Sequence, residues 1–226
     1  MLPNTVNDPS PLLSGLTLRL VALICVSLSR LGNLASIANM GRKAGWDLVV
    51  SGDPAVIATA EKLILPGVGA FDHGMSNLAD RGLIPVLQRR VLEQKIPTLG
   101  LCLGVQLFGR GSEEGTRPGL GWVAASSRRF QIPPASPIKV PHMGWNFIEV
   151  AKPTAVLDHL PAEPRFYFVH SYHLVCDDPA DVMCWTTYGY RFASGIQRDN
   201  LWGTQFHPEK SHAFGLALMK NFLALS

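Results

Sequence analysis

The segment PTLGLCLGVQ, residues 97–106, leads from a short apolar run into Gly-Leu-Cys-Leu-Gly, with the cysteine at position 102. The apolar run Pro97–Leu101 predicts a buried strand, and Leu103–Phe108 predicts the start of a helix. A strand that turns sharply into a helix around Gly-x-Cys-x-Gly is the nucleophile-elbow arrangement with cysteine in place of serine. The segment therefore predicts an α/β fold with Cys102 as a candidate nucleophile, the alternative being a buried structural cysteine.

Apolar runs alternate with helical patterns through the first half of the chain. Strands are predicted at Leu20–Val26, Asp47–Val50 and Lys62–Leu65, and helices at Asn33–Lys43, Gly74–Ala79 and Ile84–Glu93. Because strand and helix alternate, this half predicts a parallel sheet with helices on both faces.

The second half has a different pattern. Prolines at 133, 134, 137 and 141 mark a long irregular connection. Closely spaced strands are predicted at Arg165–His170, Val182–Thr187, Phe192–Ile196 and Leu201–Gln205, followed by a helix at Ala213–Leu223. We therefore expect a single α/β domain over residues 18–226, with a mixed, mostly parallel sheet flanked by helices and an antiparallel extension. Residues 1–17, rich in proline and serine, are expected to form a flexible tail.

The composition excludes several classes of protein. The length of 226 residues fits one domain, and 47% hydrophobic with 16% charged residues excludes a disordered chain and a coiled coil. The net charge is only +3 and no Lys/Arg run is present, so we expect no nucleic-acid partner. No apolar run approaches the ~18 residues of a membrane span, so we expect no membrane partner. At Leu20–Val26 a signal peptide is the alternative to a buried strand.

The four cysteines, at positions 25, 102, 176 and 184, form no Cys-x-x-Cys pair. This spacing predicts neither a zinc site nor a disulfide framework, and it favours a reducing, cytoplasmic setting. The phosphate-binding patterns GxxxxGK[ST] and GxGxxG are absent. We therefore expect neither a cofactor nor a metal ion.

His207 and Glu209 are the candidate base and its orienting carboxylate. They are two residues apart, so in extended backbone their side chains lie on one side. A thiol nucleophile needs a base, and a carboxylate can hold the histidine ring in the tautomer that accepts the thiol proton. The alternative is a surface His-Pro turn that follows a strand.

A glycine-rich turn supplies a candidate oxyanion site. Gly67, Val68 and Gly69 follow a predicted strand, and their backbone N–H groups can face a neighbouring cleft. Together with the N–H of Leu103, directly after the candidate nucleophile, they could hold a developing negative charge. An ordinary βα turn is the alternative.

Several stretches together resemble the class I, triad-type glutamine amidotransferases. These are LILPGVGAFDHGM (63–75), LGLCLGVQLFGRGSEEG (99–115), GLGW (119–122), VPHMGWN (140–146), FYFVHSYH (166–173) and GTQFHPEKS (203–211). The PHMGWN stretch is most similar to the glutaminase subunits of imidazole glycerol phosphate synthases. The resemblance implies that Cys102 attacks the side-chain amide of glutamine, that His207 moves the proton, and that Glu209 orients His207.

The resemblance also implies further binding residues and a partner. Glutamine would be contacted by Gln106, Glu114, Ser171 and Tyr172. Ammonia would pass to a cyclase subunit, which is a (β/α)8 barrel that forms a heterodimer with this chain. The implied interface residues are Pro141, His142, Met143, Trp145, Asn146 and Lys210. Simple packing is the alternative for His142 and Trp145.

One segment departs from the family, and other functions stay open. The family opens with Asp-Tyr-Gly-x-Gly-Asn, whereas residues 28–33 are Leu-Ser-Arg-Leu-Gly-Asn, and this change motivates one alternative, a catalytically silent scaffold subunit. GNLASIANMGRKAG (32–45) and YGYRFASGIQRDNLWGTQFHPEKSHAFG (188–215) resemble a paralogous glutaminase that feeds a synthase amidating an amino sugar for surface polysaccharide. A free-standing cysteine hydrolase is a further alternative.

Overall fold

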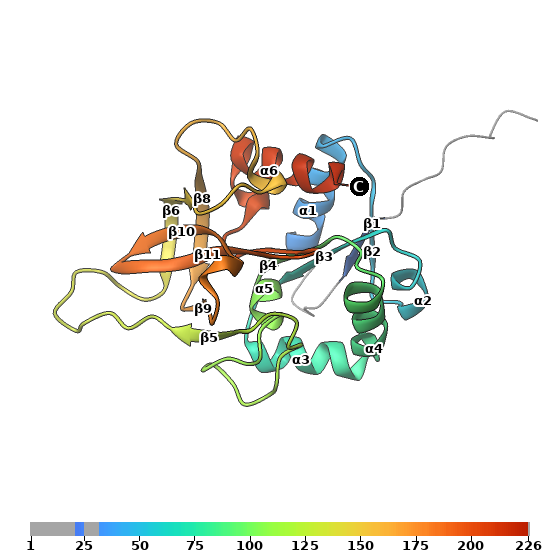
Figure 1. Cartoon of the computed structure of the whole chain (residues 1–226), viewed down its shortest axis with the longest axis horizontal. Coiled ribbons are helices and arrows are strands. Elements are labelled where there is room, and N and C mark those ends of the chain that lie inside the picture. Colours follow the sequence, from blue (N-terminus) through green and yellow to red (C-terminus); the bar gives the residue numbers. More distant parts are fainter. Residues whose placement is uncertain (1–20, 25–31, 226) are drawn as a thin grey trace, which may run out of the picture.

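The computed structural model describes residues 21–24 and 32–225, and within them a ten-stranded mixed sheet lies between two groups of helices (Figure 1). The predicted tail at 1–17 and the atypical segment 28–31 lie outside the described residues. No helix in the described part is long and apolar enough to cross a membrane.

The first half forms the predicted parallel part of the sheet, in the order β2-β1-β3-β4. Its strands are β1 (Val21–Ile24), β2 (Leu48–Ser51), β3 (Lys62–Gly67) and β4 (Thr98–Cys102). Its helices are α1 (Gly32–Lys43), α2 (Pro54–Ile57), α3 (Phe71–Asp80), α4 (Leu83–Gln88), the π-helical turn η1 (Arg89–Glu93) and α5 (Leu103–Leu107). The predicted alternation of strand and helix is therefore confirmed.

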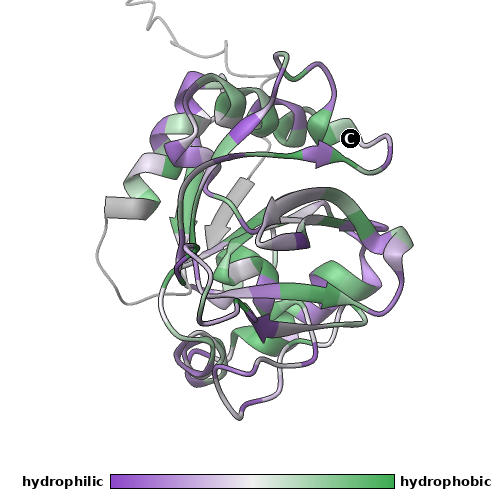
Figure 2. Ribbon diagram, turned by 90° about the vertical axis from the view of Figure 1, so that its left-hand side faces the viewer, coloured by the Kyte–Doolittle hydropathy of each residue, from purple (hydrophilic) through white to green (hydrophobic). Residues whose placement is uncertain are grey.

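Strand β3 shows why this part of the chain is apolar almost without interruption. Every residue of β3 is buried, because helices cover the sheet on both faces. Leu63 and Leu65 pack into the core beneath α3, α4 and α5, whereas Ile64 packs into the core beneath α1 and α6. Hydrophobic residues follow the central strands in Figure 2 and alternate with hydrophilic ones along the helices.

The second half extends the sheet and adds a smaller one. Its elements are β5 (Ala125–Arg129), β6 (His142–Phe147), β7 (Glu149–Val150), β8 (Arg165–His170), β9 (Tyr172–Cys176), β10 (Val182–Tyr188), β11 (Tyr190–Arg198), β12 (Leu201–Thr204) and α6 (His212–Ala224), with 3-10 turns η2 (Ala155–Leu157), η3 (Pro179–Asp181) and η4 (Pro208–Lys210). Strand β12 joins β4 in parallel, and β11, β10 and β7 continue antiparallel. We expected strand β8 to be part of this extension. It pairs instead with β6 in a separate two-stranded sheet. The expectation was wrong because alternation along one strand does not identify its partner.

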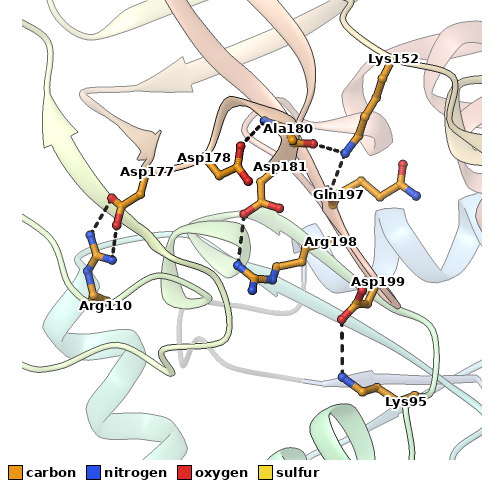
Figure 3. Close-up of polar contacts among 10 residues, drawn as sticks. All are labelled: Lys95, Arg110, Lys152, Asp177, Asp178, Ala180, Asp181, Gln197, Arg198 and Asp199. Carbon is orange, nitrogen blue, oxygen red and sulfur yellow. Dashed lines mark hydrogen bonds and ion pairs between the residues drawn. The ribbon is translucent and has the colours of Figure 1, made fainter.

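Charged side chains fasten the connection between β9 and β10 to the rest of the domain (Figure 3). Asp177 accepts two hydrogen bonds from Arg110, at 2.7 and 2.8 Å, and Arg110 lies in the loop after α5. Asp181 in η3 pairs with Arg198 at the end of β11, at 3.3 Å. The Arg110–Asp177 pair is about half exposed, so its main effect is to orient the loop after α5 relative to β9, whereas the side chain of Asp181 is largely buried beside Arg198.

The carboxyl ends of three parallel strands meet at one edge of the sheet. In the register of these strands, Gly67 lies beside Cys102, and Leu101 lies beside Thr204. The segments that directly follow the strands, residues 68–70, 103–107 and 205–207, therefore come together. In open α/β sheets, this edge is where ligands bind.

Candidate active site

The backbone at Cys102 has the strained geometry of a nucleophile elbow. Its φ is 53° and its ψ is −111°, outside the regions that non-glycine residues normally occupy. The glycines on either side are required by space. A Cβ at Gly104 would lie 1.7 Å from the carbonyl oxygen of Leu65, and one at Gly100 would lie 2.8 Å from Cα of Val105. The steric reason expected for the two glycines is therefore confirmed.

Cys102 opens into a cavity of about 520 Å³ at the carboxyl edge of the sheet. The cavity is lined by Val68, Gly69, Ala70, Cys102, Leu103, Gln106, Glu114, Pro141, Val169, His170, Ser171, Tyr172, His207 and Lys210. Segments far apart in the sequence thus supply a thiol, an imidazole, a carboxylate and a lysine to one space. No group of three or more His, Cys, Asp and Glu residues in the described part could hold a metal ion.

His207 and Glu209 form a buried pair beside Cys102. His207 donates from Nδ1 to Oε1 of Glu209 at 2.7 Å, and the side chains are 2% and 0% exposed. Burial alone would lower the pKa of His207, but the charges of Cys102 and Glu209 outweigh it and raise that pKa to about 10. The other ring nitrogen, Nε2, has no hydrogen-bond partner within normal distance, and the charge of Cys102 is the largest of the contributions that raise the pKa of the ring. The raised pKa keeps the ring of His207 protonated near neutral pH, beside the sulfur of Cys102.

The other described cysteines are in different surroundings. Burial raises the pKa of Cys176 and of Cys184 to about 12, and neither residue lines the cavity around Cys102. Both are free thiols, as is Cys102. Among the described cysteines, only Cys102 therefore combines access to the cavity with a neighbouring base.

Two polar side chains that line the cavity, Gln106 and Glu114, are held in place by backbone partners. Gln106, on α5, donates from Nε2 to the carbonyl oxygen of Tyr172 at 3.1 Å. Glu114 accepts the backbone N–H of Phe71, at the start of α3, at 2.8 Å. Fixed side chains of this kind orient a small ligand without a further loss of conformational entropy.

The loop that carries Glu114 is fastened to α3 by Asp72. The carboxylate of Asp72 accepts the backbone N–H groups of Thr116 and Arg117 at 2.9 to 3.1 Å. These two backbone hydrogen bonds, from Thr116 first, lower the pKa of Asp72. The position of Glu114 in the cavity therefore depends on an ionised side chain in the first turn of α3.

Comparison with known proteins matches residues 33–225 to the family described as glutamine amidotransferase class-I. The chain belongs to this family of class I glutamine amidotransferases. Curated relatives include the imidazole glycerol phosphate synthase subunits HisH 2 of Methanococcus maripaludis, 46% identical over 85% of this chain and 95% of that protein, and of Pseudomonas aeruginosa, 47% identical over 86% and 95%. The family expected from the sequence is confirmed.

Solved structures of this family share the fold at much lower identity. A glutamine amidotransferase from Thermotoga maritima aligns with a TM-score of 0.58 at 18% identity, covering 84% of this chain and 76% of that one. PurLQS from Thermotoga maritima aligns with a TM-score of 0.67 at 16% identity, covering 90% and 96%. The architecture of this amidotransferase, a single α/β domain with a mixed sheet, is therefore that of its family.

Most residues expected at the active site of this amidotransferase line the cavity, whereas Gly67 and Glu209 lie behind its wall. Gly67 packs behind Leu103, where an added Cβ would lie 2.8 Å from Cβ of Leu103. Glu209 reaches the cavity only through His207, to which it is bonded. The glycine therefore allows the close approach of β3 to α5 without facing a ligand itself.

Some of the residues expected at the partner interface line the cavity or are exposed, and others are turned toward the domain. Pro141 and Lys210 line the cavity, and Met143 and Trp145 are exposed on β6. His142 is only 2% exposed and is stacked on Phe168 and Tyr188, which is the arrangement that the packing alternative predicts. Asn146 donates to the carbonyl oxygen of Thr187 at 3.0 Å, which turns its amide back toward the domain.

Alternation along β6 explains this division. Met143, Trp145 and Phe147 are 61%, 43% and 53% exposed, whereas His142 faces inward. Sequence reasoning treated the stretch as one surface and missed Phe147. It also missed Gln205 and His170, although both lie in stretches that resemble the family. The signal that could have found them is their position in the sequence: Gln205 is two residues before His207, and His170 directly precedes Ser171.

Proposed function

We propose that this chain is the glutaminase subunit of an imidazole glycerol phosphate synthase. The observation that carries the proposal is that Cys102 and the His207–Glu209 pair, from two neighbouring parallel strand ends, meet at one cavity. The names of the curated relatives, which this chain matches over nearly their whole length, support the same assignment.

The proposed reaction begins at the sulfur of Cys102. The thiolate attacks the side-chain carbonyl carbon of glutamine, and the oxyanion that forms accepts hydrogen bonds from the backbone of Val68, Gly69 and Leu103. His207 gives its Nε2 proton to the leaving nitrogen, and ammonia departs as the C–N bond breaks. A water molecule then gives a proton to His207 and attacks the thioester, the C–S bond breaks, and the thiolate of Cys102 is restored while glutamate leaves and its new carboxyl group loses a proton to solvent. Glu209 keeps the ring oriented in both halves.

Glutamine fits the polar groups of the cavity. Glu114 supplies a negative charge suited to the α-amino group, and Gln106, Ser171 and Tyr172 line the same cavity. The substrate is thus held by its amino-acid end while its amide reaches Cys102.

The proposed partner is a cyclase subunit with a (β/α)8 barrel. Pro141 and Lys210 line the cavity, and Lys210 lies over the ring of Tyr167 at 5.5 Å, next to the exposed row Met143, Trp145 and Phe147 on β6. The cavity thus reaches the edge of an apolar surface through which ammonia can pass to a bound partner.

A coupled assay tests the proposal. We expect glutamate release from glutamine when the chain is mixed with a cyclase subunit, and its loss in the Cys102→Ala variant. Hydrolysis that supports only an amino-sugar synthase would assign the chain to the paralogous function. A full rate without any partner would indicate a free-standing hydrolase, and no rate with either partner would indicate a scaffold subunit.

A further inference from the structure

A chain of side-chain amides leads to the back of Cys102. Gln106 donates from Nε2 to the carbonyl oxygen of Tyr172 at 3.1 Å and to Oε1 of Gln205 at 2.9 Å. Gln205 in turn has its Nε2 3.8 Å from Sγ of Cys102, within the distance of a hydrogen bond to sulfur.

The contacts determine which way each amide is turned. The carbonyl oxygen of Tyr172 can only accept, so Gln106 must present its NH₂ group to it. The same NH₂ group meets Gln205, which must therefore present its oxygen to Gln106. The remaining group of Gln205, its own NH₂, is left facing the sulfur of Cys102.

Gln205 reaches the sulfur from inside the domain and not from the cavity. It is 2% exposed and does not line the 520 Å³ cavity, whose lining includes Cys102 and Gln106. It lies instead against a small space with Val105, Gly203 and Ser194, and its backbone N–H is bonded to the carbonyl oxygen of Ser194 at 2.9 Å. A ligand in the cavity therefore meets the sulfur without touching Gln205.

We propose that Gln205 is a further active-site residue that donates an N–H to Cys102 and thereby favours its thiolate. The proposal deepens the proposed function and rests on Cys102 being the nucleophile. The physical reason is that a hydrogen bond to an anionic acceptor is stronger than one to its neutral form, so a fixed donor stabilises the ionised sulfur. The amide does so without carrying a charge of its own, and Gln106 keeps it from turning.

The pH dependence of Cys102 alkylation by iodoacetamide tests this in the isolated full chain. The Cys102 peptide is followed by mass spectrometry in the wild type, in Gln205→Met, and in a control, Gln88→Met, at an exposed glutamine on α4. We expect the midpoint for Gln205→Met to move up by about one pH unit, a tenfold loss of thiolate at a given pH, and the control to match the wild type. An unmoved midpoint in a folded Gln205→Met variant overturns the proposal.

Gln205→Asn covers the case in which the methionine variant does not fold. Its amide is one methylene shorter and cannot span from Gln106 to the sulfur, so the same upward move is expected. In the coupled glutaminase assay, both variants should lower kcat about tenfold with KM unchanged. A rise in KM alone would place Gln205 in glutamine binding and contradict the proposal. If the wild type released no glutamate, the proposed function would be contradicted. The alkylation experiment would still test the contact between Gln205 and Cys102.

Discussion

Oε1 of Glu209 accepts a hydrogen bond from Nδ1 of His207 at 2.7 Å, with both side chains almost completely excluded from solvent. A proline between the two residues starts the 3-10 turn η4, which brings the side chains together on one side of the turn. The pair is therefore formed locally, while its position beside Cys102 depends on the pairing of β12 with β4.

Replacing the carboxylate by an amide tests the orienting role of Glu209. In Glu209→Gln the ring of His207 loses a negative partner, so its pKa should fall from about 10 and kcat for glutamate release should drop by about 10³-fold or more. The coupled assay and the NMR titration of His207 measure the two effects. Glu61→Gln, at an exposed position, is the control and should match the wild type. Full activity in Glu209→Gln would remove Glu209 from the mechanism.

The raised pKa of His207 predicts a loss of stability in alkaline solution. The folded-state pKa, about 10, lies above the value near 6.5 expected for an unfolded chain, so the stabilisation is complete below about pH 6.5 and is lost as the pH rises through about 10. Urea midpoints measured between pH 6 and 10 should fall more steeply in the wild type than in Cys102→Ala, which lacks one charge that raises this pKa. Parallel curves would contradict the charge interaction between the two residues.

The turn around Cys102 should not tolerate a side chain at position 104, which is a glycine. In Gly104→Ala the new Cβ would meet the backbone oxygen of Leu65 at 1.7 Å, so we expect the free energy of unfolding to fall by about 3 kcal/mol or more. Gly111→Ala is the matched control, because its nearest neighbour would be 3.8 Å away, and it should change stability by less than about 0.5 kcal/mol. Equilibrium urea unfolding distinguishes the two, and similar values would be inconsistent with the close approach of β3 to α5.

The exposed row on β6 should carry the contact with the partner. Trp145→Asp should weaken binding to the cyclase subunit by about 30-fold or more, since buried aromatic residues at the centre of an interface carry much of its binding energy. Val50→Asp is the control, because Val50 is 45% exposed, close to the 43% of Trp145, but lies on β2, far from β6 in Figure 1. Titration calorimetry measures both. Equal affinities for the two variants would place the partner elsewhere.

The fastening of the Glu114 loop by Asp72 should affect glutamine binding. Asp72→Asn weakens the acceptor for the N–H groups of Thr116 and Arg117, so KM for glutamine should rise roughly fivefold while kcat stays near the wild-type value. Asp80→Asn, exposed at the end of the same helix, should have no effect.

Hydrogen exchange at different pH values follows the same Asp72 contact. The pKa of Asp72 is lowered by its backbone hydrogen bonds, so the contribution of this carboxylate is fully present above its unfolded value near 3.8 and is lost as the pH falls through the lower pKa of the folded state. Exchange of residues 112–117, compared between wild type and Asp72→Asn at each pH, should differ at pH 7 and converge only when the pH falls below the lowered folded-state pKa of Asp72. A difference that persists at low pH would mean that the loop is held by other contacts.

Local pattern was enough to identify the strands of the first half, its helices except the short α2, and the residues placed directly after strand ends. Apolar runs such as Lys62–Leu65 are buried on both faces and leave little choice of structure, and the glycines around Cys102 are demanded by a turn within the same segment. Four strands of the second half, β5, β6, β7 and β9, were not predicted; β7 has only two residues and β5 is mostly polar.

The sequence by itself determined the family, the parallel sheet, and Cys102, His207 and Glu209 as the residues of chemical interest, because these rest on short motifs and patterns that can be recognised one stretch at a time without knowing how the stretches pack. Only the tertiary structure decided that β8 pairs with β6, that His142 turns inward while Trp145 turns outward, and that the amide of Gln205 meets the sulfur of Cys102. Those relationships depend on strand register and side-chain direction, which are set by packing between segments about 100 residues apart in the case of Cys102 and Gln205.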